Sequence, residues 1–324
     1  MTRTKTVHET NMHTIAYLNG QFVKSGDLNV PPYDAGFLLG ATIAEQIRTF
    51  HGRPFWLKQH LNRLHRGLAL AGIELPIGGA ALHDAVRTVI GNNHPIQSRD
   101  EADDIGITIF VTPGPYEAYG VNSDGPTVAV HTYPLQFRIW ADKYQSGQRA
   151  VISAIREVPA DCWPAAIKCR SRMHYFLASK AARETDCGAI PILLDHDGYV
   201  SETPIASVLT YTERNGFAVP SPEKTLPGIS LAYVKQWAAR RQIPFRHLDL
   251  QPADLANADE VILVSTPFCA LPLVVVDGKP IRDGTPGGIY SQLVNDWSDD
   301  VGVDISKQAE VFRTLGEPAV GPAT

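Results

Sequence analysis

Lys168 is the residue whose surroundings best suit nucleophilic chemistry. The five residues before it, Trp163-Pro164-Ala165-Ala166-Ile167, carry no charge. An amine that loses water in apolar surroundings shifts toward its neutral, nucleophilic form. A lysine that ends a strand and extends its ammonium into water has the same sequence pattern, so the apolar run leaves both interpretations open.

Glu202 and Arg63 are charged residues at the ends or edges of predicted elements. Glu202 ends a predicted strand that follows the turn at His196-Asp197-Gly198, and most carboxylates in such a place are simply solvated. Arg63 precedes Leu64, which belongs to the apolar face of a predicted helix, so its guanidinium lies at the edge of the buried face. A guanidinium there either faces water or binds a phosphate.

The string Leu226-Pro227-Gly228-Ile229-Ser230 predicts the start of a helix. A Pro-Gly turn is followed by Leu231, Val234 and Trp237 at helical spacing. The first amides of a helix have no partner within it and bind anions, although an ordinary capped helix gives the same pattern.

Predicted strands outnumber predicted helices, and no glycine-rich dinucleotide fingerprint is present, so we expect the α+β class. Strands are predicted at residues 15–23 (a hairpin around Asn19-Gly20), 45–50, 54–56, 105–112, 127–131, 150–155, 190–195, up to 202, 208–212, 217–219, 261–265 and 273–276. Helices are predicted at residues 57–71, around 82–89, at 173–184 and from the 226–230 string onward.

The chain has 324 residues, enough for two domains at roughly 150 residues each. Residues 133–147 lack strong periodicity, which predicts an N-terminal α+β domain at 14–138 and a C-terminal α+β domain at 139–324. Residues 1–13 are polar, lack periodicity and have no apolar core of the kind a secretory signal carries, so we expect a flexible tail.

The composition excludes several classes of protein. Hydrophobic residues make up 44% and charged residues 19%, as in globular proteins, and the net charge of −5 is the wrong sign for coating a phosphate backbone. The four cysteines form no CxxC motif and have no histidine at zinc-ligand spacing, so we expect neither disulfides nor a metal, and a cytoplasmic location. The sequence contains no run of about 18 apolar residues, so we expect no membrane span.

Several strings resemble, in the same order, the fold-type IV (class IV) pyridoxal-phosphate (PLP) enzymes. This family includes branched-chain and D-amino-acid aminotransferases, R-selective amine transaminases and 4-amino-4-deoxychorismate lyase. The strings are YLNGQFV, PPYDAGFLLGATIAEQIRTFHGRPFWLKQHLNRL, AAIKCRSRMHY, LLDHDGYVSET, TLPGIS and VILVSTPFCALPLVVVDG. Glu202 lies 34 positions after Lys168, close to the family's separation between its Schiff-base lysine and its pyridine-nitrogen glutamate.

The resemblance implies a role for each candidate residue. Lys168 would form the Schiff base with PLP and move the substrate proton, and Glu202 would keep the pyridine nitrogen protonated. Tyr175 would hydrogen-bond the ring oxygen, although it follows Lys168 by seven positions, farther than in several relatives. The remaining residues would hold the phosphate; they are Arg63, Gly228, Ile229, Ser230 and Thr266.

The chain departs from the family pattern on the substrate side. Ala44 precedes Glu45 where many relatives have an aromatic residue, and Ser207 stands where asparagine is common. Pro113 follows Val111-Thr112 where D-amino-acid and R-amine transaminases have an arginine that binds the substrate carboxylate. Arg138 could supply the missing charge, although an arginine exposed on a linker is the simpler interpretation.

The resemblance therefore implies a PLP-dependent aminotransferase with the cofactor between its two domains. It would transfer an amino group between an amino acid or amine and a 2-keto acid, as a homodimer, because family members complete the substrate pocket with a neighbouring subunit. A PLP-dependent lyase similar to 4-amino-4-deoxychorismate lyase is the alternative. A binding protein that keeps the fold without catalysis is a third possibility, which the joint presence of Lys168, Glu202, Arg63 and the LPGIS string argues against.

Overall fold

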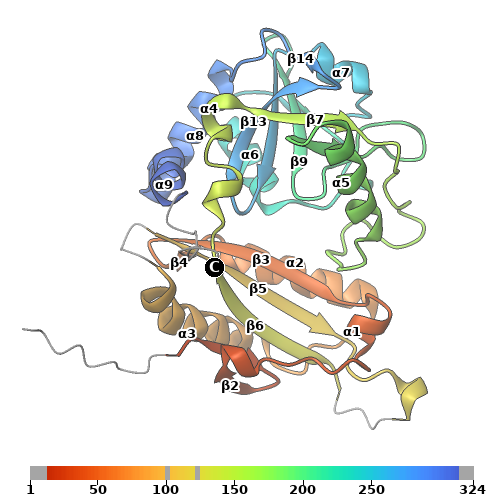
Figure 1. Cartoon of the computed structure of the whole chain (residues 1–324), viewed down its shortest axis with the longest axis vertical. Coiled ribbons are helices and arrows are strands. Elements are labelled where there is room, and N and C mark those ends of the chain that lie inside the picture. Colours follow the sequence, from red (N-terminus) through yellow and green to blue (C-terminus); the bar gives the residue numbers. More distant parts are fainter. Residues whose placement is uncertain (1–12, 99–102, 121–124, 314–324) are drawn as a thin grey trace, which may run out of the picture.

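The computed structural model describes residues 13–98, 103–120 and 125–313. Figure 1 shows two sheets, one above the other, each with its own helices. Nearly all of the predicted tail at residues 1–13 lies outside the described residues. None of the described helices has the length and apolar content that a membrane span requires.

The N-terminal sheet has six strands in the order β2-β1-β6-β5-β3-β4. Their bounds are β1 Ile15–Leu18, β2 Gln21–Lys24, β3 Ile43–Phe50, β4 Arg53–Pro54, β5 Ile105–Thr112 and β6 Thr127–Pro134. All neighbouring strands are antiparallel. The predicted hairpin is confirmed: Asn19 and Gly20 join β1 to β2 with φ angles of 46° and 92°, which a primed turn requires.

Two helices pack against this sheet, α2 (Leu57–Ala71) and α3 (Gly79–Gln97). Leucines recur at helical spacing along α2 and join the core that the sheet forms with α3. The helix ends at Gly72, whose φ of 67° lets its amide bond back to the last turn, as the sequence predicts. Shorter elements are α1 (Ala35–Leu38), η1 (Ser25–Asp27) and η2 (Glu117–Tyr119).

The C-terminal sheet has eight strands in the order β11-β10-β9-β12-β13-β7-β8, with β14 paired to β13. Their bounds are β7 Gln148–Ile152, β8 Ala189–Ile192, β9 Ser207–Thr212, β10 Gly216–Val219, β11 Phe245–His247, β12 Glu260–Ser265, β13 Cys269–Val276 and β14 Lys279–Pro280. The sheet is mixed, since β7 lies parallel to both β8 and β13 and β10 parallel to β11, and antiparallel pairs make up the rest. Its helices are α5 (Met173–Thr185), α6 (Ile229–Arg240), α7 (Pro252–Ala256), α8 (Gly288–Val301) and α9 (Ile305–Phe312).

The connection between the two sheets runs from Pro134 to Gln148 and contains η3 (Phe137–Ile139) and α4 (Lys143–Ser146). The predicted domain boundary between residues 138 and 139 falls within this connection, and it remains a prediction.

The predicted strand that ends at Glu202 is wrong. The backbone there forms two isolated bridges, Leu194 with Val200 and Glu202 with Ser207, and β8 already ends at Ile192. The Leu193 amide donates to the Glu202 carbonyl at 2.9 Å, while the Leu193 carbonyl accepts from the Ser201 amide at 3.0 Å, so two residues face one and no regular ladder continues. Glu202 therefore lies in irregular backbone rather than at the end of a strand.

Arg48 joins the two halves of the molecule through a buried network. This side chain of β3 is 1% exposed and donates to the Pro267 carbonyl at 2.9 Å and to Gln308 Oε1 at 2.7 Å. Gln308 of α9 donates in turn to Asp104 Oδ2 at 2.8 Å, and Thr49 donates to the other oxygen of Asp104 at 2.6 Å. The position of α9 against β3 thus depends on one buried amide that satisfies both a cation and an anion.

Replacing that amide with an apolar side chain should destabilise the protein. Gln308→Leu leaves an N–H of Arg48 without its acceptor and leaves Asp104 Oδ2 with the longer hydrogen bond from the His51 amide, at 3.3 Å, so we expect the free energy of unfolding to fall by about 3 kcal/mol in urea titrations. Gln59→Leu, on the exposed face of α2, is the matched control and should change it by less than about 0.5 kcal/mol. Equal effects of the two substitutions would show that the network contributes nothing.

Candidate active site

Lys168 lies in an extended segment that pairs with the start of β3. The Ala44 amide donates to the Lys168 carbonyl at 2.9 Å, and the Arg170 amide donates to the Thr42 carbonyl at 2.8 Å. The side chain lines a cavity of about 510 Å³ between the two halves of the molecule. Burial lowers the pKa of Lys168 to about 8, the positive charge of Arg63 adds to this effect, and Glu45 opposes it. A substantial fraction of this amine is therefore neutral near pH 8.

Arg63 projects from α2 and is held by a buried carboxylate. Its Nε and Nη2 atoms donate to the two oxygens of Glu45 at 2.7 Å each, and its Nη1 donates to the Pro227 carbonyl at 3.0 Å. His60 lies one turn earlier on α2, with its Nδ1 atom 2.8 Å from Glu45 Oε2. The sequence places Arg63 at the edge of the buried face, and the structure buries it almost completely, at 4% exposure.

Glu45 is the anion that compensates this burial. Burial by itself would raise its pKa, but the charge and hydrogen bonds of Arg63, together with those of His60, lower it to about 2. Burial lowers the pKa of His60, against the opposing effect of Glu45. The carboxylate therefore stays charged and fixes the guanidinium in a bidentate geometry.

Glu202 lines the same cavity, and its carboxylate is half-buried. Burial raises its pKa, while the Tyr175 hydroxyl, which donates to Glu202 Oε1 at 2.5 Å, opposes the rise. Among the described residues no cation forms an ion pair with Glu202. A positively charged group brought into the cavity would supply the partner that this carboxylate lacks.

Tyr175 donates a hydrogen bond to Glu202, and its contact with the ring oxygen, which the resemblance implies, stays a prediction. A phenol has one proton, and the Tyr175 proton is directed to Glu202 rather than toward the open cavity. Burial raises the pKa of this phenol, and the charge of Glu202 raises it further, so Tyr175 remains a donor. Tyr175 thus lies behind Glu202 and holds its orientation.

The helix start predicted by the LPGIS string is confirmed. Gly228 is the residue before α6, no side chain caps the helix, and Ile229 and Ser230 form its first turn. A Cβ atom at Gly228 would lie 3.0 Å from the Ser207 hydroxyl oxygen, so a larger residue would crowd this wall of the cavity. Thr266, which follows β12, lines the cavity as well.

Seven predicted site residues thus line one cavity; they are Lys168, Glu202, Arg63, Gly228, Ile229, Ser230 and Thr266. Of the residues that mark departures from the family, Ser207 lines the cavity, whereas Ala44 is buried outside it. Arg138 is exposed and does not line it.

Three further cavity residues, Gln46, Tyr133 and Arg170, were not predicted from the sequence. Arg170 had one available signal: it follows Lys168 by two positions, and such residues share one side of an extended segment. Gln46 and Tyr133 reach the cavity only because β3 and β6 belong to the same sheet.

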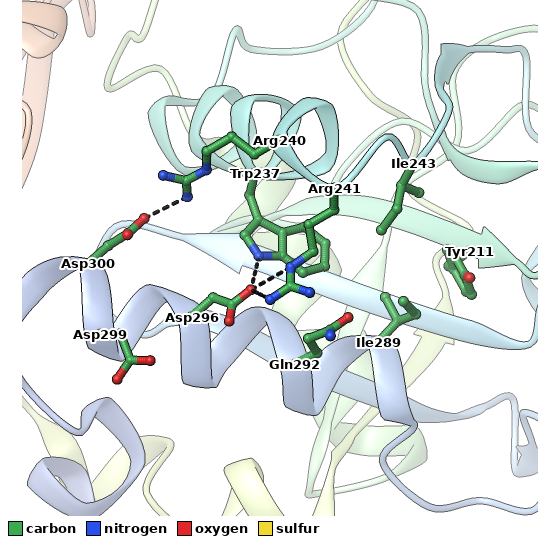
Figure 2. Close-up of a pocket in the computed structure, with 10 residues that line it drawn as sticks. All are labelled: Tyr211, Trp237, Arg240, Arg241, Ile243, Ile289, Gln292, Asp296, Asp299 and Asp300. Atoms are coloured by element: carbon green, nitrogen blue, oxygen red, sulfur yellow. Dashed lines mark hydrogen bonds and ion pairs between the residues drawn. The ribbon is translucent and has the colours of Figure 1, made fainter.

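A second hollow, of about 690 Å³, lies between α6 and α8 and contains none of the predicted residues. Figure 2 shows that two acidic residues of α8 bind side chains at the end of α6: Asp300 binds Arg240, and Asp296 binds Trp237 and also Arg241, which directly follows α6. Both arginines are thus committed to carboxylates. No cluster of potential metal ligands occurs within the described ranges.

Comparison with known proteins identifies the family. The model of the amino-transferase class IV family matches residues 42–276, most of the chain. The chain belongs to the class IV aminotransferases, a family of PLP-dependent enzymes, and is itself a PLP-dependent aminotransferase.

Individual relatives agree with this assignment. The D-alanine aminotransferase of Bacillus licheniformis is 26% identical over 275 residues, which are 85% of this chain and 93% of that protein. A T.th. branched-chain amino acid aminotransferase, solved with pyridoxamine 5'-phosphate, has a TM-score of 0.79 at 21% identity and covers 89% of this chain and 94% of its own. The branched-chain aminotransferase of Thermoproteus uzoniensis, solved with norvaline, has a TM-score of 0.77 at 21% identity. The match covers 93% of this chain and 97% of that one. The predicted fold-type IV α+β architecture is thereby confirmed.

The cavity residues fit PLP. Lys168 offers an amine whose pKa is lowered by burial, and Glu202 offers a half-buried carboxylate that forms no ion pair among the described residues. A guanidinium has five N–H groups, and only three hydrogen bonds from Arg63 are made within the protein, so two remain for a phosphate beside the free amides of α6.

The contact between Glu45 and Arg63 predicts a pH-dependent stability. Because the folded-state pKa of Glu45 lies below its ordinary value of 4.5, the contact stabilises the protein fully above about pH 4.5, and this contribution is lost as the pH falls toward 2. We expect Glu45→Gln to lower the free energy of unfolding by about 3 kcal/mol at pH 7, and the difference from the parent to be about 2 kcal/mol smaller at pH 3. Urea titrations at both pH values measure it.

Glu74→Gln serves as the matched control, since Glu74 is exposed and should give the same small change at both pH values. A Glu45→Gln effect that does not vary between pH 7 and pH 3 would contradict the assignment of a depressed Glu45 pKa.

Proposed function

We propose that this aminotransferase is a cytoplasmic homodimer that exchanges an amino group between an amino acid or amine and a 2-keto acid, with Lys168 and Glu202 as its catalytic residues. The observation that supports these roles is that Lys168, Glu202, Arg63 and the start of α6 all line one cavity. The four cysteines are unpaired, as a reducing compartment permits.

Lys168 is the nucleophile and the base in this proposal. Its lowered pKa gives a neutral amine that can take a proton from the substrate carbon and return one to the cofactor side. When bound, PLP supplies a conjugated ring that accepts the electron pair left at the substrate carbon. Glu202 would keep the ring nitrogen of bound PLP protonated, and the Tyr175 hydroxyl, which donates to Glu202 Oε1, holds that carboxylate in place.

Arg63 and the first turn of α6, here called the phosphate pole, would hold the phosphate of the cofactor. Arg63 offers its two unused N–H groups, while the amides of Ile229 and Ser230 and the Thr266 hydroxyl add uncharged donors. These contacts position the cofactor without taking part in bond changes.

Removing the amine of Lys168 should abolish amino transfer. Lys168→Ala lacks both the nucleophile and the base, so we expect turnover to fall on the order of a thousandfold or more, with the circular dichroism spectrum of the parent. The assay screens amino donors against one keto-acid acceptor. Borohydride reduction followed by peptide mass analysis should find the cofactor on Lys168 in the parent and on no residue in the variant.

Lys180→Ala, an exposed lysine of α5, is the control and should retain parental turnover. A cofactor trapped on another lysine, or normal turnover of Lys168→Ala, would overturn the role of Lys168. Release of pyruvate from aminodeoxychorismate without amino transfer to any keto acid would instead indicate the lyase.

The dimer proposal is supported by an exposed apolar patch beside the cavity. Leu39, Met173 and Phe176 line one groove and are 57%, 68% and 62% exposed, and Phe37 of the adjoining α1 is 73% exposed. Such large side chains, grouped on one face, are typical of an interface. Arg170 lines both this groove and the catalytic cavity, so a second copy bound here would lie next to the substrate site.

Charges within this patch should separate the subunits. We expect Met173→Asp combined with Phe176→Asp to reduce the mass measured by light scattering from twice 35.4 kDa to 35.4 kDa, because a buried unpaired carboxylate is costly. Leu248→Asp, an exposed leucine after β11, is the control and should leave the mass unchanged. A parent protein of 35.4 kDa would contradict the dimer.

A further inference from the structure

The cavity contains a cation that neither the phosphate pole nor Glu202 accounts for. Arg170 lines the cavity together with Lys168, and within the described ranges its side chain forms no hydrogen bond or ion pair. Its backbone amide is bound to Thr42, so the segment that carries it is fixed while the side chain is uncommitted.

The backbone geometry directs Arg170 to the same side as Lys168. Residues 168–170 pair with the start of β3 through hydrogen bonds at both ends and a bridge between Ile43 and Cys169. Alternate residues of such a segment share a face and lie about 7 Å apart along it. In agreement, Lys168 and Arg170 line the cavity, whereas Cys169, between them, does not.

Two uncharged polar side chains face the same cavity. The Tyr133 hydroxyl and the Gln46 amide both line it and have no partner among the residues that the structure describes. Tyr133 pairs across the sheet with Gly106, where a Cβ atom would lie 2.2 Å from the Tyr133 ring. A glycine at position 106 therefore makes room for the phenol ring. Arg170 and Tyr133 lie close enough to affect each other's pKa, which burial raises for Tyr133 and lowers for Arg170.

The other arginines near the cavity have partners or lie elsewhere. Arg63 binds Glu45 and the Pro227 carbonyl. Arg172 donates to the Pro204 carbonyl and lies over the Tyr175 ring at 4.5 Å. Arg138 is exposed outside the cavity.

We propose that Arg170 binds the carboxylate of the substrate, with the Tyr133 hydroxyl as a second donor. This inference rests on the proposed amino-transfer function and narrows its substrate class: the site takes amino acids and keto acids in preference to simple amines. A guanidinium is suited to this task because it donates two parallel hydrogen bonds to a carboxylate.

The test measures binding, so it does not depend on turnover. Hexanoate and 1-hexanol, which share an alkyl chain and differ in charge, are titrated into the holoenzyme by calorimetry. Arg170→Gln should weaken hexanoate binding at least tenfold and leave hexanol binding unchanged, which also shows that the cavity is intact. Arg170→Lys should recover part of the hexanoate affinity. The KM of the keto acid should be lowest in the parent, higher in Arg170→Lys and highest in Arg170→Gln.

Two further variants test whether Arg170, rather than another arginine, binds the carboxylate. Arg138→Gln, the matched exposed control, should bind hexanoate as the parent does. Hexanoate affinity that is unchanged in Arg170→Gln, or lost instead in Arg172→Gln, would overturn the proposal. If the parent enzyme transfers amino groups but Arg170→Gln binds hexanoate as tightly as the parent does, the proposed function holds and only the role of Arg170 is wrong. If hexanoate binding depends on Arg170 but no amino transfer is found, Arg170 binds carboxylates and the proposed amino-transfer function is wrong.

Discussion

The buried contact between Glu45 and Arg63 sets the electrostatics of the catalytic cavity. A guanidinium at 4% exposure beside Lys168 needs a counter-charge, and the bidentate carboxylate supplies it from the neighbouring strand. Arg63 lowers the pKa of Lys168 and Glu45 raises it, so the pair moderates its own effect on the amine. The pair as a whole is neutral, so what Arg63 offers a phosphate is its two unused N–H groups rather than a net charge.

Strand β3 contacts several separate parts of the site. Consecutive residues of a strand face opposite sides, so Glu45 meets α2 while Gln46 lines the cavity. Arg48, two positions after Gln46, extends to Pro267 and α9 in the C-terminal half. The beginning of the same strand pairs with the backbone at Lys168. One strand therefore fixes Arg63, the backbone at Lys168 and the contact between the two halves.

The cavity has charged groups at separate positions, each with its own support. Glu45 and His60 support Arg63, and Tyr175 supports Glu202. Arg170 is different, because its backbone is fixed and its side chain is uncommitted. In the proposed assignment, groups that hold the cofactor are pre-organised by the protein, whereas the group that holds the exchangeable substrate is completed by the substrate itself.

Local patterns in the sequence determined much of this protein. The Asn19-Gly20 turn, the end of α2 at Gly72 and the start of α6 after Gly228 depend on neighbouring residues and are all found where the sequence predicts them. The resemblance to class IV enzymes named seven residues that line one cavity. Tertiary structure alone decided which residues meet across long separations. Glu202 was predicted at the end of a strand, but Ser201 and Glu202 both hydrogen-bond to Leu193, which makes the pairing of that segment irregular. The contact of Tyr175 with Glu202 and the approach of Tyr133 to Arg170 have the same origin, because partners distant in the chain are chosen by packing and burial rather than by local propensity.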